Sequence, residues 1–367
     1  MIPVSAPLLN GREMDYVREA VESGWISSEG RFIAAFEQRW AEYCGVPHGI
    51  AVSNGTVALQ LALRALDLPA GSEVILPSCT IISCVLAVLE ADCVPVLVDS
   101  DPQTWCMNAD QVAAKITPRT RVLMPVHLLG HPCDMAPLRE LADRHGLLIV
   151  EDAAEAHGAE YNGRRCGSLG TLACFSFYAN KIITTGEGGM VTTADPVLAE
   201  RLRAMRNLCF RRDRRFLHTE LGFNYRLTNM QAAVGLAQVE RIGEHIAIKR
   251  RIAARYLEGL HGLPLTLPVE RPWARNVYWM FGLVLDDGVP FDADELAIRM
   301  RKEGVDSRPF FLGMHEQPIL KARGLFEGEQ YPVAERLARR GVYLPSGLGL
   351  GPAQQETVID VMRQVLA

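Results

Sequence analysis

The sequence contains no apolar run long enough to cross a lipid bilayer. The run Ile81–Leu89 has nine residues and includes Ser83, whereas a transmembrane helix needs about 20. The first residues also lack the basic and then apolar layout of a secretory signal peptide. We therefore expect a cytoplasmic protein that has no membrane partner.

The sequence also lacks an excess of basic residues and any closely spaced cysteine pair. Its 38 Lys and Arg face 43 Asp and Glu, a net charge of −5, so we expect no nucleic-acid partner. The nine cysteines are odd in number, form no Cys-x-x-Cys pair and are confined to residues 44–209. This pattern is typical of buried, reduced thiols, and it predicts no metal site.

Between residues 48 and 210 the sequence alternates short β-branched runs with helical stretches. Continuous apolar runs favour strands buried on both faces, and strand–helix alternation favours parallel pairing. We predict a three-layer α/β/α domain with a mixed, mostly parallel sheet. The predicted strands are 48–52, 73–76, 94–99, 121–126, 147–151, about 171–177 and 189–193. The predicted helices between them are 56–66, 81–90, 108–116 and 134–145.

The pattern changes after residue 228. Residues 228–260 contain no proline and few glycines, which predicts one long helix or two nearly continuous ones, capped by Thr228 or Asn229. A smaller α+β unit of about 120 residues follows, with a strand at 277–285 and helices at 293–303 and 352–366. We therefore predict a large domain, 1–240, and a small one, 241–367. An N-terminal arm, 1–30, can pack on the small domain.

Polar residues follow the predicted strands, at the edge where open α/β sheets bind ligands. Gly55 and Thr56 open a helix whose free N–H groups favour a phosphate, although an ordinary capped turn would have the same sequence. Asp152 follows a run of apolar residues, so its carboxylate either pairs with a cation or caps a turn. A protonated pyridine nitrogen would be such a cation.

Lys181 lies between a predicted strand and a glycine-rich turn. Apolar neighbours would lower its pKa and make it a nucleophile, whereas a solvated turn lysine would be inert. Gly186, Gly188 and Gly189 do not form Gly-x-Gly-x-x-Gly, which argues against a nicotinamide oxidoreductase. A phosphate cradle, a carboxylate for a ring nitrogen and an amine for a Schiff base are together the groups that pyridoxal phosphate requires.

At these residues the chain resembles the DegT/DnrJ/EryC1/StrS sugar aminotransferases, which have the fold type I of the aspartate aminotransferase superfamily. Their Ser-Phe-x-x-x-Lys…Gly-Glu-Gly-Gly signature corresponds to Ser176–Gly189, and their Glu-Asp-Ala-Ala block to Glu151–Ala154. The resemblance runs from about Pro7 to the C-terminus. Within the family, details at 24–28, 184–187, 222–226 and 307–309, and Glu155, are similar to those of GDP-perosamine synthases.

The resemblance implies a pyridoxal phosphate enzyme and assigns roles to its residues. Lys181 would hold the cofactor as a Schiff base and then move a proton, Asp152 would pair with the ring nitrogen, and Glu155 would bind the ring hydroxyl. Ile81 would cover the ring at a position where relatives carry an aromatic residue. The phosphate would be bound by Gly55, Thr56, Ser176 and, from the neighbouring subunit, Asn224. The enzyme would therefore be a homodimer with shared active sites.

Substrate contacts are implied less directly. Arg226 is the preferred contact for a sugar-linked diphosphate, and the basic run Arg211–Arg215 with His218 either grips the same group or forms a solvated loop. Trp25 would line the cleft. His315 would contact the substrate or pack in the core, and the same choice applies to His127 and His157.

The implied reaction moves an amino group from L-glutamate to a nucleotide-linked keto sugar. The first substrate to consider is GDP-4-keto-6-deoxymannose, which would give GDP-perosamine. Transfer to C3 of a GDP-linked 3-keto sugar, to a dTDP or UDP sugar, or to a keto-cyclitol stays open. A non-catalytic sensor that binds pyridoxal phosphate is a further alternative.

Overall fold

The computed structural model describes residues 1–211 and 213–366. Among them, seven strands form the main sheet in the order β1-β9-β8-β5-β4-β2-β3. Their bounds are β1 (His48–Val52), β2 (Glu73–Pro77), β3 (Val94–Val98), β4 (Thr120–Leu123), β5 (Leu148–Asp152), β8 (Leu172–Ser176) and β9 (Gly189–Thr193). In this sheet β9 runs in the direction opposite to the other six strands. The predicted mixed, mostly parallel α/β sheet is therefore confirmed.

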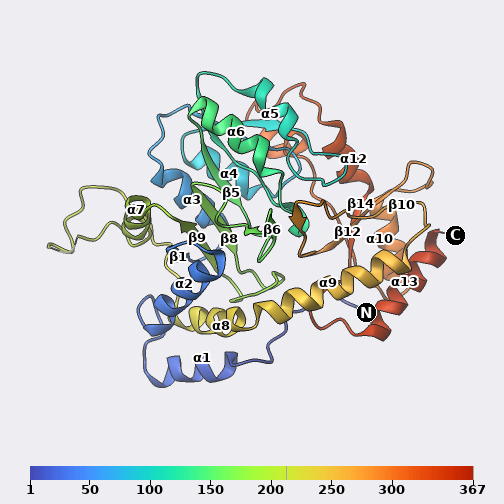
Figure 1. Cartoon of the computed structure of the whole chain (residues 1–367), viewed down its shortest axis with the longest axis horizontal. Coiled ribbons are helices and arrows are strands. Elements are labelled where there is room, and N and C mark those ends of the chain that lie inside the picture. The colour runs from blue at the N-terminus through green and yellow to red at the C-terminus, as the bar shows by residue number, and fades with distance from the viewer. Residues whose placement is uncertain (212, 367) are drawn as a thin grey trace.

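Helices pack on both faces of this sheet (Figure 1). Successive side chains at the end of β8 point to opposite faces of the sheet, and both faces are covered. Phe175 and Phe177 contact Trp40, while Ser176 faces the start of α3. The helices associated with this sheet are α2 (Arg31–Cys44), α3 (Gly55–Ala65), α4 (Ser83–Glu90), α5 (Ala109–Lys115), α6 (Met135–His145) and α7 (Pro196–Arg206). The sequence patterns predicted α3 to α6 but not α2 or α7. Ends of parallel strands and starts of helices thus meet at one edge of the sheet.

A long, nearly continuous pair of helices, α8 (Asn229–Glu240) and α9 (Ile242–Gly259), leads to the second part of the molecule (Figure 1). Thr228 caps α8 in a reciprocal capping box with Gln231, one of the two predicted caps. The helices are separated at Arg241, whose φ of −114° departs from helical geometry. The N-terminal helix α1 (Glu13–Glu22) lies along α8.

The second part is built on a four-stranded sheet with its own apolar core. Its strand order is β10-β12-β14-β13. The elements are β10 (Leu265–Thr266), β12 (Phe281–Leu285), β13 (Arg308–Pro309), β14 (Gly341–Leu344), α10 (Ala293–Lys302), α11 (Pro318–Lys321), α12 (Pro332–Arg340) and α13 (Pro352–Leu366). Ile2 pairs with Val305, and Ser346 donates its N–H to the Val4 carbonyl, so the extreme N-terminus packs here. The division at residues 240 and 241 stays a prediction.

Short elements complete the fold. A three-stranded sheet has the order β11-β6-β7, with β6 (Glu160–Tyr161), β7 (Arg164–Arg165) and β11 (Ala274–Arg275). Two 3₁₀ turns, η1 (Leu128–Gly130) and η2 (Met314–Glu316), precede α6 and α11. The predicted strand 277–285 begins only at Phe281, because Tyr278 has a φ of +49° that no regular strand adopts. Across the described ranges, no helix combines the length and the apolar character that a membrane crossing requires.

Candidate active site

A cavity of about 620 Å³ opens at the edge of the main sheet where β5 and β8 end. The residues that line it come from these strand ends, from the starts of α3 and α4, and from the turn after β8. Those that the sequence predicted for the cofactor are Gly55, Thr56, Ile81, Asp152, Glu155, Ser176 and Lys181. The structure thus brings together every predicted cofactor residue except Asn224.

The start of α3 forms an anion-binding cradle in this cavity. Asn54 caps the helix by accepting the Val57 N–H at 3.0 Å. The next two residues, Gly55 and Thr56, line the cavity, so the start of the helix points into it. A Cβ on Gly55 would lie 2.7 Å from the Ser176 Cβ, so only glycine permits this approach. The Thr56 hydroxyl lies 2.8 Å from that of Ser83. Hydroxyls and a helix N-terminus converging on one point suit a phosphate group.

Asp152 is buried at the end of β5, and both of its carboxylate oxygens are held. Oδ1 accepts the N–H of Ala154 at 3.0 Å. Oδ2 accepts the thiol proton of Cys84 at 3.0 Å, and this thiol is itself 3.1 Å from the Thr80 hydroxyl. The carboxylate is therefore fixed in one orientation at the wall of the cavity.

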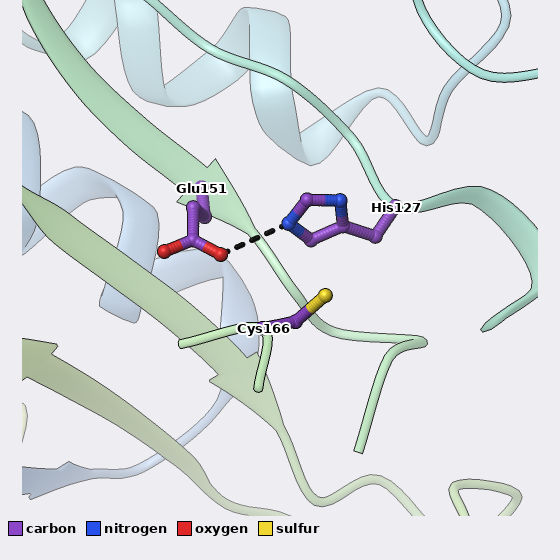
Figure 2. Close-up of side chains that lie close together, drawn as sticks. All are labelled: His127, Glu151 and Cys166. Carbon is purple, nitrogen blue, oxygen red and sulfur yellow. Dashed lines mark hydrogen bonds and ion pairs between the residues drawn. The ribbon is translucent and has the colours of Figure 1, made fainter. Parts of the chain in front are cut away.

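The neighbouring Glu151 belongs to a separate network with His127 and Cys166 (Figure 2). Its carboxylate accepts the N–H groups of Gly167, Leu169 and Gly170 at 2.7–2.9 Å and lies 3.0 Å from His127 Nε2. The other ring nitrogen of His127 accepts the Cys133 N–H at 3.0 Å, which places the ring proton on Nε2.

Ligand atoms of His127, Glu151 and Cys166 lie within 4.8 Å of one another, close enough for a shared metal ion. The hydrogen bonds already occupy the histidine nitrogens and the carboxylate, and all three side chains are buried. The cluster therefore ties the loop 166–170 to the end of β5. His127 has this structural role and does not line the cavity.

Lys181 is nearly buried, and its Nζ lies 3.9 Å from Glu155 Oε1. Burial lowers the pKa of Lys181, while the carboxylates of Glu155 and Asp152 partly oppose this effect. Burial also raises the pKa of Glu155 to about 7, although Lys181 opposes that shift. The Leu129 N–H donates to Glu155 Oε2 at 2.7 Å and holds the carboxyl in place. An amine with a lowered pKa and a carboxyl with a raised pKa are thus placed side by side.

A model of the DegT/DnrJ/EryC1/StrS aminotransferase family matches residues 7–363. The chain belongs to this family. It is 46% identical to the GDP-perosamine synthase of Caulobacter vibrioides over 100% of this chain and 98% of that relative. It is 41% identical to the GDP-perosamine synthase of Escherichia coli O157:H7, over 94% and 93%.

Two further similarities come from Streptomyces venezuelae. The chain is 42% identical to a dTDP-3-amino-3,4,6-trideoxy-alpha-D-glucose transaminase, over 91% of this chain and 87% of that relative. The crystal structure of DesV superposes with a TM-score of 0.90 at 41% identity, covering 96% of this chain and 94% of the other. The resemblance to sugar aminotransferases that the motifs indicated is therefore confirmed.

Enzymes of this family use pyridoxal phosphate. The cavity of this aminotransferase fits that cofactor on geometric grounds, because the glycine-lined cradle, the buried carboxylate and the buried amine are complementary to its phosphate, ring nitrogen and aldehyde. Ile81 lines the mouth of the cavity and is 45% exposed, so its side chain is free to cover a bound ring.

Asn224 and Arg226 lie outside this cavity. Arg226 donates to Asn224 Oδ1 at 2.8 Å and to Asn207 Oδ1 at 3.1 Å. Arg226 lines a second hollow of about 810 Å³. The arginines that share this hollow are Arg203, Arg206, Arg211 and Arg215. Of the basic run predicted at 211–215, Arg212 lies outside the described residues. Whether Asn224 serves a neighbouring subunit stays a prediction.

Three other predicted residues are also placed away from the cavity. Trp25 is 55% exposed and lines a shallow hollow beside Asn229. His315 is buried, with Nδ1 2.8 Å from the Ser78 hydroxyl and Nε2 3.1 Å from Glu335 Oε1, so the geometry favours packing over substrate contact. His157 packs among aromatic rings, where burial lowers its pKa to about 3.

Sequence reasoning missed several residues of the site. Cys84 is hidden in an apolar run, and its bond to Asp152 joins the start of α4 to the end of β5. Phe311 reaches the cavity from the second part of the chain, and Glu187 from the glycine-rich turn. The signature that contains Glu187 could have indicated it; nothing local marks Cys84 or Phe311.

Proposed function

We propose that this aminotransferase moves the amino group of L-glutamate to C4 of GDP-4-keto-6-deoxymannose and so forms GDP-perosamine. The observation that carries the proposal is the full-length identity of 46% to a GDP-perosamine synthase, together with an intact set of Lys181, Asp152 and Glu155 around one cavity. The amine donor and the nucleotide-linked keto sugar would use this cavity in turn.

The residues of the cavity would hold pyridoxal phosphate in a single orientation. The N–H groups of Gly55 and Thr56 and the hydroxyls of Thr56 and Ser176 would bind its phosphate. Asp152 would bind the ring nitrogen, and Glu155 the ring hydroxyl. When bound, the cofactor supplies an electron sink that makes the α-proton of the amino donor removable.

Lys181 would move the protons of both half-reactions. In the first, Nζ takes the proton from the α-carbon of L-glutamate; in the second, it delivers a proton to the sugar carbon that gains the amine. The lowered pKa of Lys181 favours the neutral amine that the first task needs. Glu155, whose pKa is raised to about 7, can take up or return a proton beside it.

The active unit would be a homodimer in which Asn224 reaches the cofactor phosphate of the other subunit. Arg226 would contact the diphosphate of the sugar nucleotide, because a guanidinium binds phosphate oxygens in pairs. The arginine-rich second hollow beside Arg226 supports an anionic ligand. Contacts of the substrate with Trp25 or His315 stay predictions that the single chain does not support.

A second candidate reaction is transfer to C3 of a nucleotide-linked keto sugar. The 42% identity to the Streptomyces venezuelae 3-amino-sugar transaminase, over 91% of the chain, favours it. The two candidates share every residue assigned above and differ in how the sugar is seated.

The test is to incubate the enzyme with pyridoxal phosphate, ¹⁵N-labelled L-glutamate and a panel of keto sugar nucleotides, and to locate the new amine by NMR. We expect a C4 amine on the GDP-linked 4-keto sugar and formation of 2-oxoglutarate. The Lys181→Ala variant should lose both the yellow colour and turnover. A C3 product would support the second candidate, and a spectral change with glutamate but no aminated sugar would overturn both in favour of a sensor.

A further inference from the structure

Trp279 contacts the amine of Lys181 from the second part of the chain. The Nζ atom lies 3.9 Å from the centroid of the indole ring. Trp279 is buried and is not among the residues that line the cavity. The ring therefore supports the lysine from a side that the substrates do not use.

The indole is also tied to the backbone next to the lysine. Its Nε1–H donates to the carbonyl of Asn180 at 2.9 Å. One side chain thus contacts the Lys181 amine through its face and the preceding residue through its edge. This double contact fixes where Nζ lies relative to the ring.

The chain takes a strained path to bring Trp279 there. Tyr278 has a φ of +49°, which is unfavourable for an aromatic residue, and its N–H is held by Asn276 Oδ1 at 2.8 Å. Gly130 approaches Trp279 so closely that a Cβ on residue 130 would lie 2.7 Å from the backbone nitrogen of Trp279. Such strain persists only where surrounding contacts maintain it.

The η1 turn, which contains Gly130, also positions Glu155, the second neighbour of the Lys181 amine. Gly130 ends η1, and Leu129 within this turn donates its N–H to Glu155 Oε2 at 2.7 Å. The Val277 N–H donates to the Gly130 carbonyl at 3.1 Å. The η1 turn therefore positions both Glu155 and Trp279 around Nζ.

An indole face attracts a cation more strongly than a neutral amine, and the attraction increases where water is excluded. Around Lys181, burial favours the neutral amine, whereas Trp279 and Glu155 favour the ammonium. The indole face and Glu155 therefore offset part of the effect of burial, and they hold the amine in place once it has taken up a proton.

We propose that Trp279 is a positioning residue that holds Lys181 against its indole face whenever this amine has taken up a proton and is not bonded to the cofactor. The inference rests on the proposed role of Lys181 as the cofactor-bearing lysine. It predicts that the indole raises the pKa of the free Lys181 amine and limits its reaction with other electrophiles.

The test measures that pKa directly. The enzyme is first incubated with excess L-glutamate, which frees Lys181, and the glutamate is then removed by gel filtration. The protein is labelled with trinitrobenzenesulfonate at a series of pH values, and the Lys181 peptide is followed by mass spectrometry. We expect Trp279→Leu to lower the pKa of Lys181 by about one unit and to raise labelling at neutral pH up to about tenfold. Trp279→Phe, which keeps a ring face but loses the bond to Asn180, should retain most of the wild-type pKa.

An unchanged pKa in Trp279→Leu would overturn the proposal, and so would equal shifts in the Leu and Phe variants, which would assign the effect to the Asn180 bond. If Trp279→Leu does not fold, the wild-type sequence is produced with mono- or difluorotryptophan, which keeps the shape of the indole and weakens its attraction for a cation stepwise. A constant pKa of Lys181 in that series would also refute the proposal. The same titration on cofactor-free protein needs no substrate. A failure of the proposed sugar transfer, with labelling as expected, would therefore be recognised separately.

Discussion

Asp152 is oriented by two donors of different kinds, a backbone N–H on Oδ1 and the Cys84 thiol on Oδ2. A thiol is a weak donor, but in a buried site its loss leaves a carboxylate oxygen without a partner. Burial raises the pKa of the Cys84 thiol, with the Asp152 carboxylate as a further cause, so the thiol keeps its proton and donates it. Cys84 therefore acts through Asp152.

We expect Cys84→Ala to lower kcat and cofactor affinity about three- to tenfold, because the Asp152 carboxylate loses the donor to Oδ2 and is free to rotate. Cys84→Ser, which keeps a donor, should retain most of both. Steady-state kinetics and titration of the visible absorbance measure these effects. Cys93→Ala, a buried thiol that donates to the Ala91 carbonyl, is the matched control. Equal losses in all three variants would contradict the role of the hydrogen bond.

Helix α9 carries a buried lysine at the joint between the two parts of the molecule. Lys249 donates to the Ser346 carbonyl beyond β14, and Ser346 also pairs with Val4 of the N-terminal arm. Burial lowers the pKa of Lys249 to about 7. The unfolded chain binds this proton up to about pH 10.4, so between pH 7 and 10 unfolding takes up a proton and stability rises with pH.

Lys249→Met should remove that rise. The wild-type free energy of unfolding should gain up to about 1.4 kcal/mol per pH unit from this group between pH 7 and 9, and the variant should lack this contribution. Urea unfolding at pH 7, 8 and 9 measures the slopes. Lys302→Met, on the exposed end of α10, should keep the wild-type slope. Parallel slopes for wild type and Lys249→Met would show that Lys249 stays charged in the folded protein.

Within one chain, the two anion-binding features that the proposed reaction would use together lie apart. The cofactor cradle lies at the sheet edge, whereas Arg226 lies in the arginine-rich hollow beside the segment that joins α7 to α8. This segment extends away from the body of the molecule (Figure 1) and carries the strongly exposed Phe216 and Leu221. We expect a second copy of the chain to cover these exposed apolar side chains in the proposed dimer.

We expect two impaired variants to complement each other in a mixed dimer. Arg226→Ala should raise KM for the sugar nucleotide about tenfold or more with a smaller change in kcat, and Lys181→Ala should be inactive. Co-expression of the two chains should restore about a quarter of the wild-type sites, because half of the dimers are mixed and each has one intact site.

Activity at low substrate concentration measures this recovery in the co-expressed mixture, and mixed dimers isolated by different tags should have about half of the wild-type sites, because each has one intact site of two. Lys181→Ala with Asp152→Ala, which affect the same site, should not recover. A mixture of Arg226→Ala and Lys181→Ala that is no more active than its parts would show that Arg226 does not serve the neighbouring subunit. Arg363→Ala, on α13, should leave KM unchanged.

Local patterns predicted the elements that are periodic or strongly apolar. The strands 48–52 and 189–193 and the helix 134–145 were predicted within one residue of their observed bounds. Helix α2 was missed although Phe32, Phe36, Trp40 and Cys44 recur at helical spacing on its buried face. The strand before Phe281 was overextended because Tyr278, with its positive φ, turns the backbone out of the strand.

Sequence by itself predicted which residues carry the chemistry. The motifs placed the Gly55 turn, Asp152 and Lys181 just after predicted strands, the resemblance added Glu155, and parallel strands bring such ends to one edge. Only the tertiary structure decided what surrounds them. Trp279 and Cys84 meet Lys181 and Asp152 across large sequence separations, and His315 is drawn into a buried bond with Ser78 rather than into the cavity. The physical reason is that contacts between distant segments depend on packing, which no local periodicity encodes.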